Sequence, residues 1–227
     1  MGILYILALT SIGVYGLVLA GWASNSKYSL IGGLRSSAQL ISYELAMGLS
    51  VVSVILLAGS LKLNVIVEDQ QGYLLSWNVF KQPVAFLIFL VAVYAETNRL
   101  PFDLTEAEQE LVGGYHTEYS SMKFAMFFTA EYANMVTAAA LTVTLFFGGW
   151  DVPLLNETSM GALGAILSVS SFILKTAFFL FLFIWVRWTF PRFRYDQLMK
   201  LGWKVMLPLA LINIFVTGGY LTLTSLR

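Results

Sequence analysis

The stretch "AQLISYELAMGLSVVSVILLAGS", residues 38–60, decides the fold class of this chain. A helix needs about 20 predominantly apolar residues to cross the hydrocarbon core of a bilayer, and this stretch is long enough. Its only acid is Glu44, some five residues from its start. The stretch therefore predicts a transmembrane helix that carries an acid within the membrane.

The rest of the chain agrees with this interpretation. Hydrophobic residues make up 58% of the sequence and charged residues 11%, with a mean hydropathy of +0.77, whereas soluble proteins average about 25% charged residues. The same template finds five further apolar spans, at about 3–23, 83–97, 124–148, 161–187 and 203–224. Tryptophans suited to the membrane interface mark several ends: Trp22, Trp150, Trp185, Trp188 and Trp203. We predict an all-α, polytopic transmembrane helix bundle of about six helices, with residues 1–227 forming one membrane domain.

Composition also excludes several kinds of site. The net charge is zero and no basic run is interleaved with aromatics, so the sequence does not indicate a nucleic-acid surface. The chain has no cysteine and one histidine, His116, so it lacks the usual ligands for iron–sulfur clusters, haem and structural zinc. We expect no metal or cofactor to be bound by this chain, and any electron carriers must lie in partner subunits.

The distribution of basic residues predicts the orientation of the chain in the membrane. The loops 24–37, 98–123 and 188–202, with their flanks, hold nine: Lys27, Arg35, Arg99, Lys123, Arg187, Arg192, Arg194, Lys200 and Lys204. The opposite side holds three: Lys62, Lys81 and Arg227. The first set of loops is therefore expected to face the cytoplasm or the mitochondrial matrix.

One of these inner loops, 98–123, is unusually acidic. Six acids crowd into the 23 residues from 96 to 118: Glu96, Asp103, Glu106, Glu108, Glu110 and Glu118. Thr105 followed by Glu108 has the spacing of a capping box, which predicts a short helix over 106–112. An ordinary explanation is that the acids complement the dipole of that helix on a wet loop.

Charged residues within the spans argue for more than a capped loop. Glu44 and Glu131 are each about 8–12 Å deep from the inner side, and an acid near a helix centre costs about 2.5–3.5 kcal/mol. Such acids usually line a cavity or a proton path. If the two share a cavity of low dielectric constant, they cannot both ionise cheaply, so at least one is expected to be protonated at neutral pH. Lys175 is the only base in mid-span, and its alternative role is to pair with one of these carboxylates.

Three stretches carry a resemblance to a known family. They are "GWASNSKYSLIGGLRSSAQLISYE" (21–44), "AETNRLPFDLTEAEQELVGGYHTEYSSMKFAMFFTAEYANM" (95–135) and "WVRWTFPRFRYDQLMKLGWK" (185–204). The chain resembles the membrane subunit of respiratory complex I, the bacterial NADH-quinone oxidoreductase, that bears the quinone chamber and is known in mitochondria as NADH dehydrogenase subunit one. That family has eight spans, so the resemblance implies that the first two, with the amphipathic segment between them, are not in this chain.

The resemblance implies roles for individual residues. Glu106, Glu108 and Glu110 match acids that line the quinone cavity, Arg99 and Asp103 match a framework pair of the same loop, and Arg35 matches a basic residue of the preceding inner loop. The residues expected to lead protons or charge from the cavity into the membrane arm are Glu44, Glu96, Glu118 and Glu131. Lys175 is added to this proton path because it is a base in mid-span. His116 falls where other members carry an amide, which argues against an obligatory relay role.

The implied function is a membrane subunit of proton-pumping NADH:quinone oxidoreductase, with ubiquinone or menaquinone as substrate and with FMN and iron–sulfur clusters in partner subunits. The expected partners are the hydrophilic arm at loops 24–37, 98–123 and 188–202, small membrane subunits and lipid. The basic loop 188–202 also suits topology control or anionic-lipid contact. The expected location is the bacterial plasma membrane or the mitochondrial inner membrane.

Other functions fit the same spans. The alternatives are the homologous membrane anchor of a membrane-bound hydrogenase or formate hydrogenlyase, a free-standing proton-coupled transporter, and a passive scaffold. The resemblance implies that the hydrogenase relatives lack the "DLTEAEQELV" run (103–112).

Overall fold

The structure, a computed structural model, describes residues 2–103, 114–153 and 161–225, and within these ranges it is helical with no strand. The elements are α1 (Gly2–Ala23), α2 (Lys27–Ala58), α3 (Leu63–Glu68), η1 (Leu74–Ser76), α4 (Asn78–Lys81), α5 (Pro83–Glu96), η2 (Gly114–His116), α7 (Ser121–Phe146), α8 (Ala162–Thr189), α9 (Tyr195–Lys200), the π-helical turn η4 (Leu201–Met206) and α10 (Leu207–Ser225). The predicted all-α fold is confirmed.

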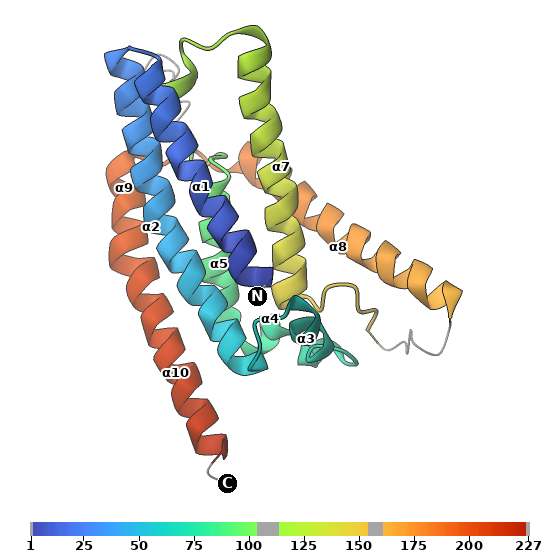
Figure 1. Cartoon of the computed structure of the whole chain (residues 1–227). Helices are drawn as coiled ribbons and strands as arrows, with labels where there is room; N and C mark the ends of the chain where they lie inside the picture. The colour runs from blue at the N-terminus through green and yellow to red at the C-terminus, as the bar shows by residue number, and fades with distance from the viewer. Residues whose placement is uncertain (1, 104–113, 154–160, 226–227) are drawn as a thin grey trace.

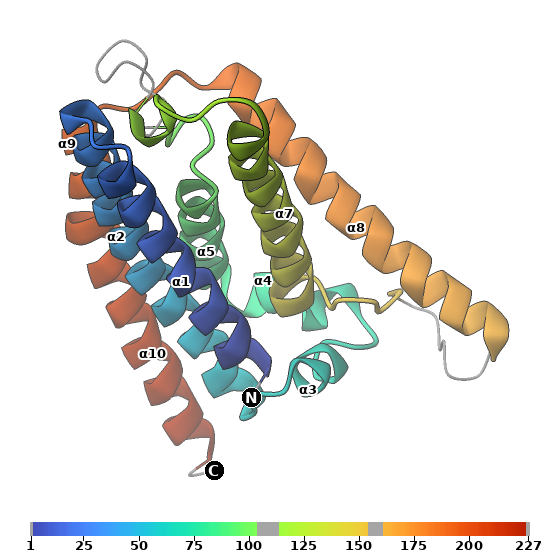
Figure 2. The same ribbon diagram turned by 45° about the horizontal axis from the view of Figure 1, so that its top comes forward.

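The long helices form a bundle in which α1, α2 and α10 lie side by side, with α5 and α7 completing it (Figure 1). Helix α8 packs on α7, but its N-terminal part leans away from the other helices, as both views show (Figure 2). The short helices α3 and α4 cover one end of the bundle, near both described chain ends. The turn that contains η2 lies at the other end, which we call the inner end after the predicted orientation.

Each of the six predicted spans overlaps a helix. Four continuous helical stretches are long and apolar enough to cross a membrane, namely Gly2–Ala23, Lys27–Ala58, Ala162–Thr189 and Tyr195–Thr224. Helix Pro83–Glu96 is apolar but shorter, and the predicted fourth span corresponds to α7. The chain is therefore a multi-pass membrane protein.

Helix α2 begins well before the predicted span. Its first eleven residues carry Lys, Arg, Ser and Gly, which lower the hydropathy, yet several of these residues are buried against neighbouring segments. A Cβ on Gly32 would lie 3.0 Å from the backbone of Gly114, and a Cβ on Gly33 would lie 3.0 Å from the carbonyl oxygen of Leu17. Small residues thus let α1 and the η2 turn approach the α2 backbone closely, as is common between membrane helices.

Candidate functional site

A cavity of about 260 Å³ lies between α1, α2, α5 and α7. Three acids line it, one from each of three helices: Glu44 of α2, Glu96 of α5 and Glu131 of α7. The other lining residues are Leu9, Thr10, Gly13, Val14, Leu17, Leu40, Thr97, Asn98, Tyr115, Phe127, Ala130 and Asn134. The structure therefore brings Glu44 and Glu131 to one cavity, and it adds Glu96 to them.

Helix α1 supplies a hydroxyl group to one of these acids. The Ser11 hydroxyl donates a hydrogen bond to Glu44 Oε1. The Thr10 hydroxyl, which lines the same cavity, donates to the carbonyl oxygen of Leu7 at 2.9 Å. Neither Thr10 nor Ser11 is predicted from the sequence as a site residue. The signal that could have found them is the pair of adjacent hydroxyl residues in an otherwise apolar span.

Arg99 provides the cation at the cavity edge. Its Nη2 lies 3.5 Å from Glu131 Oε2, and its guanidinium group lies 4.5 Å from the centre of the Tyr132 ring. The side chains of Arg99 and Glu131 are 8% and 14% exposed, so the ion pair is largely shielded from solvent. A cation beside the acids offsets part of the cost of holding a negative charge in the membrane.

The segment that carries Arg99 is fixed to α2 by buried polar contacts. Gln39 Nε2 donates to the carbonyl oxygens of Ala95 and Phe102, at 3.1 and 2.9 Å. The Tyr43 ring packs edge-on against Phe102, with ring centres 5.6 Å apart. These contacts hold the chain between the end of α5 and Asp103 in one place on α2.

The basic loop 188–202 is joined to α2 and to the segment of Asp103 by an ion pair, a cation–ring contact and a hydrogen bond. Asp103 accepts a bond of 3.1 Å from Arg192 Nη2, while the Arg35 guanidinium group lies 5.0 Å from the centre of the Tyr195 ring. The Tyr43 hydroxyl donates to the carbonyl oxygen of Leu198, at 3.0 Å. Arg99 and Asp103 thus each tie their segment to another element, through Glu131 of α7 and Arg192 of the basic loop.

Glu118 and His116 lie apart from the acids of the cavity. Glu118 is exposed and lines a separate pocket of about 520 Å³ at the inner end of α7, together with Ser24 and Lys123. His116 is half-buried, with its ring next to those of Tyr115 and Phe124. Glu118 therefore lies at the inner end, outside the cavity that holds the other three acids.

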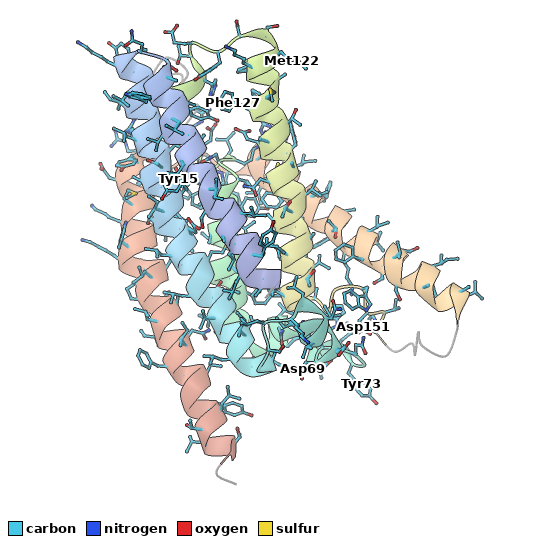
Figure 3. The ribbon with its side chains drawn as sticks, viewed as in Figure 1. Tyr15, Asp69, Tyr73, Met122, Phe127 and Asp151 are labelled. Carbon is cyan, nitrogen blue, oxygen red and sulfur yellow. The ribbon has the colours of Figure 1, made fainter. Side chains whose placement is uncertain are left out.

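Lys175 lies at the other end of the molecule. Its Nζ donates to the carbonyl oxygens of Phe147, Gly149 and Asp151, at 2.9, 3.2 and 2.6 Å. Phe147 follows Glu131 by 16 residues along α7, which corresponds to about 24 Å. Figure 3 shows this separation: Phe127, which lines the cavity, is near the inner end, and Asp151 is near the opposite end. Lys175 is thus too distant to be the direct partner of Glu131.

Three predicted site residues, Glu106, Glu108 and Glu110, and the capping box that precedes them lie outside the described residues. Within the described ranges, no group of three or more His, Asp or Glu residues is arranged to hold a metal ion. What the described site offers chemically is a set of carboxyl groups that can pass protons within one cavity, next to a fixed cation.

Comparison with known sequences identifies the family. A family model described as NADH dehydrogenase matches residues 1–218. The chain belongs to this family. Members similar to it include NADH-quinone oxidoreductase subunit 8 of Rhodothermus marinus, at 62% identity over 95% of this chain and 66% of the relative. The corresponding NADH-quinone oxidoreductase subunit of Salinibacter ruber is 60% identical over 94% of this chain and 64% of the relative. A corresponding subunit of Geobacter sulfurreducens is 60% identical over 99% of this chain and 61% of the relative.

Membership of the NADH dehydrogenase family agrees with the resemblance seen in the sequence, and it covers nearly the whole chain. The chain spans about two thirds or less of the length of these relatives. The cavity acids and Arg99 all lie within the matched residues 1–218, so the site belongs to the part of the chain that the family shares.

Proposed function

We propose that this chain is a membrane subunit of a proton-pumping NADH:quinone oxidoreductase. In this proposal it forms part of the quinone-binding chamber and a path of carboxyl groups that couples quinone reduction to proton translocation. The observation that carries the proposal is the cavity in which Glu44, Glu96 and Glu131 meet beside Arg99. If the acids of loop 98–123 only complemented a helix dipole, the acids within α2 and α7 would have no role.

The quinone chamber is assigned to the inner end. Arg99 and Asp103 are fixed there, and the loop acids Glu106, Glu108 and Glu110 follow Asp103 directly in the sequence. Arg35 lies on the same end, against the first turn of α9. A negatively charged intermediate of quinone reduction would be favoured by these cations, while the acids supply the protons that the reduction consumes.

The proton path runs from the inner surface into the bundle. Glu118 is its exposed entrance, and Glu131, Glu96 and Glu44 are its members in the cavity. Because these acids lie on separate helices around one space, a proton can pass between them through side-chain rotation or water. Lys175 is left outside this path because its Nζ is bound to three carbonyl oxygens at the other end of α7.

The partners follow from the same proposal. Electrons reach the quinone from FMN and iron–sulfur clusters in other subunits of the complex. The hydrophilic arm docks on the inner loops 24–37, 98–123 and 188–202, and small membrane subunits cover other helix faces. The similar relatives named above come from bacteria, which favours the bacterial plasma membrane as the location.

The test replaces Glu44 and Glu131 separately by glutamine in the assembled complex. Each amide keeps the size of the side chain but cannot exchange a proton. Quinone-linked turnover and pumping in reconstituted vesicles should fall together by about tenfold, the effect of adding about 1.4 kcal/mol to the barrier. Electron transfer from NADH to an artificial acceptor that bypasses the quinone should be unchanged.

Glu68→Gln is the matched control, since Glu68 is an exposed acid at the opposite end of the bundle. Its turnover should equal that of the unmodified complex. If Glu44→Gln and Glu131→Gln both pump and reduce quinone at the unmodified rate, the cavity is not a proton path. Purification without flavin and iron–sulfur subunits, together with substrate-driven proton flux, would instead support a transporter.

A further inference from the structure

Another polar pocket lies at the end of the bundle opposite the acid cavity. Its volume is about 570 Å³, and it is formed where the end of α2, the turn between α4 and α5, and α10 come together. Its lining residues are Leu57, Asp69, Lys81, Gln82, Pro83, Asn213, Val216, Thr217 and Tyr220. None of these residues belongs to the site proposed above.

The floor of this pocket is a closed network of uncharged polar groups. Gln82 Nε2 donates to Thr217 Oγ1 at 2.8 Å, and Asn213 Nδ2 donates to Gln82 Oε1 at 2.9 Å. Gln82 and Thr217 are each 5% exposed. Because buried polar groups are costly unless they are hydrogen-bonded, this network fixes the position of α10 against the start of α5. The floor is therefore rigid and neutral.

The rim of the pocket carries one positive and one negative charge. Lys81 Nζ and Asp69 Oδ2 are 3.1 Å apart, and their side chains are 34% and 46% exposed. This bond uses one of the three hydrogens of the ammonium group, so donors and carboxylate acceptors remain available to a ligand. An exposed pair of this kind contributes little stability by itself, which leaves both groups free to bind other ions.

Apolar side chains line the rest of the pocket. Val216 and Tyr220 are 65% and 63% exposed on the same face of α10, and Leu57 and Pro83 also line the pocket. Tyrosine is favoured at the level of lipid headgroups, where its ring is in the apolar region and its hydroxyl in the polar region. Figure 3 shows Asp69 at this end of the bundle, far from Phe127 of the acid cavity.

We propose that this pocket binds the headgroup of a phospholipid that carries a phosphate next to a primary ammonium group, as in phosphatidylethanolamine. The phosphate is bound by Lys81 and the ammonium group by Asp69, while the acyl chains lie along Val216 and Tyr220. Charge complementarity selects this ligand, because the rim offers one cation and one anion side by side. An anionic headgroup would leave Asp69 without a cationic partner from the ligand. The apolar walls select the lipid over a soluble phosphate ester.

The test uses phosphatidylethanolamine with a photoactivatable group near the start of one acyl chain, added to the delipidated intact complex. Crosslinked peptides mapped by mass spectrometry should include the part of α10 that holds Val216 and Tyr220. Unlabelled phosphatidylethanolamine should compete, whereas phosphatidylglycerol and soluble phosphoethanolamine should not. Equal competition by phosphatidylglycerol would overturn the headgroup assignment, and competition by soluble phosphoethanolamine would overturn the assignment to a lipid.

Variants of the rim test the charges separately. Lys81→Gln and Asp69→Asn should each lower labelling at this site by about tenfold, as expected for loss of one charge-assisted hydrogen bond. The exchange of both residues, Lys81→Asp with Asp69→Lys, keeps an ion pair but reverses its direction, so it should lower labelling similarly. Lys62→Gln, an exposed lysine at the same end that does not line the pocket, should label normally. Unchanged labelling in all the rim variants would show only unspecific lipid contact and would overturn the proposal.

Discussion

The two ends of α7 hold charged side chains in opposite ways. Near the inner end, Glu131 lies in a cavity with two other acids and is paired with Arg99 at 3.5 Å. At the outer end, Lys175 Nζ donates hydrogen bonds of 2.9, 3.2 and 2.6 Å to three carbonyl oxygens. It also lies 4.7 Å from the centre of the Trp77 ring. The first charge has space and exchange partners around it, whereas the second has all three of its hydrogens engaged.

The outer arrangement is part of a larger cap on the C-terminus of α7. The last carbonyl groups of a helix have no partner within it, so they need donors from elsewhere. Gln70 donates to the carbonyl oxygen of Thr144 and Asn78 to that of Leu145, while Lys175 bonds the carbonyl groups that follow. A cation at this position also interacts favourably with the helix dipole.

The comparison teaches that depth in the membrane does not by itself indicate proton transfer. Glu131 and Lys175 are both ionisable residues within predicted spans, yet only Glu131 lines a cavity with other acids. Removing the proton from Lys175 would weaken its bonds to all three carbonyl groups at once. The inner acids are therefore expected to control turnover, and the outer charge to affect stability without affecting turnover.

The largest effect is expected from Arg99→Met at the inner end. Breaking a buried ion pair from one side costs roughly 3 kcal/mol or more, because the remaining charge keeps its cost of burial. The temperature at which the purified complex loses half its activity should fall sharply. Adding Glu131→Gln to Arg99→Met should recover part of this loss, since the second change removes the uncompensated charge.

Arg187→Met is the matched control, because Arg187 is exposed at the end of α8. It should leave the midpoint temperature unchanged. An Arg99→Met complex as stable as the unmodified one would mean that the ion pair with Glu131 is not a stabilising contact.

A smaller effect is expected from Lys175→Met at the outer end. Methionine has a similar length but no donor, so three carbonyl groups lose this partner. Because the site is only partly buried, water can replace the ammonium group, and the total cost should be about 1–3 kcal/mol, that of one unsatisfied buried group. The midpoint temperature should fall while quinone turnover per assembled complex stays unchanged. Lys62→Met, an exposed lysine at the outer end, should change neither. If turnover falls at unchanged stability, Lys175 belongs to the proton path after all.

The sequence predicts the helices well, because they depend on local composition. Glu44 and Glu131 stand out since an acid in an apolar span is costly wherever the helix packs. The same rule marks Lys175, but its partners are backbone carbonyl groups of the loop after α7. Every residue has a carbonyl group, so no sequence pattern indicates which ones will bind a lysine.

The start of α2 and the role of α1 also depend on packing between distant segments. Residues 27–37 are too polar for a hydropathy template, and their burial against Gly114 and Leu17 becomes visible only in three dimensions. Ser11 and Glu44 are 33 residues apart in sequence. Their contact requires α1 and α2 to pack face to face in a particular register, which a pattern within one helix does not fix.

The smallest effect is expected from Ser11→Ala, which removes a single hydroxyl group from the inner site. Alanine keeps α1 helical, and the Ser11 hydroxyl is the group that binds Glu44 Oε1. A hydrogen bond of this kind contributes about 1 kcal/mol, so a carboxyl group that is less well held in the cavity should lower quinone-linked turnover by about fivefold. The control is Ser170→Ala, since Ser170 is exposed on α8 and bonds only within its own helix in the described structure. Turnover equal to the unmodified rate would show that Ser11 does not position Glu44. A loss of turnover greater than that of Glu44→Gln itself would show that Ser11 acts through something other than this acid. The packing of α1, and not only the cavity acids, would then determine turnover at the inner end.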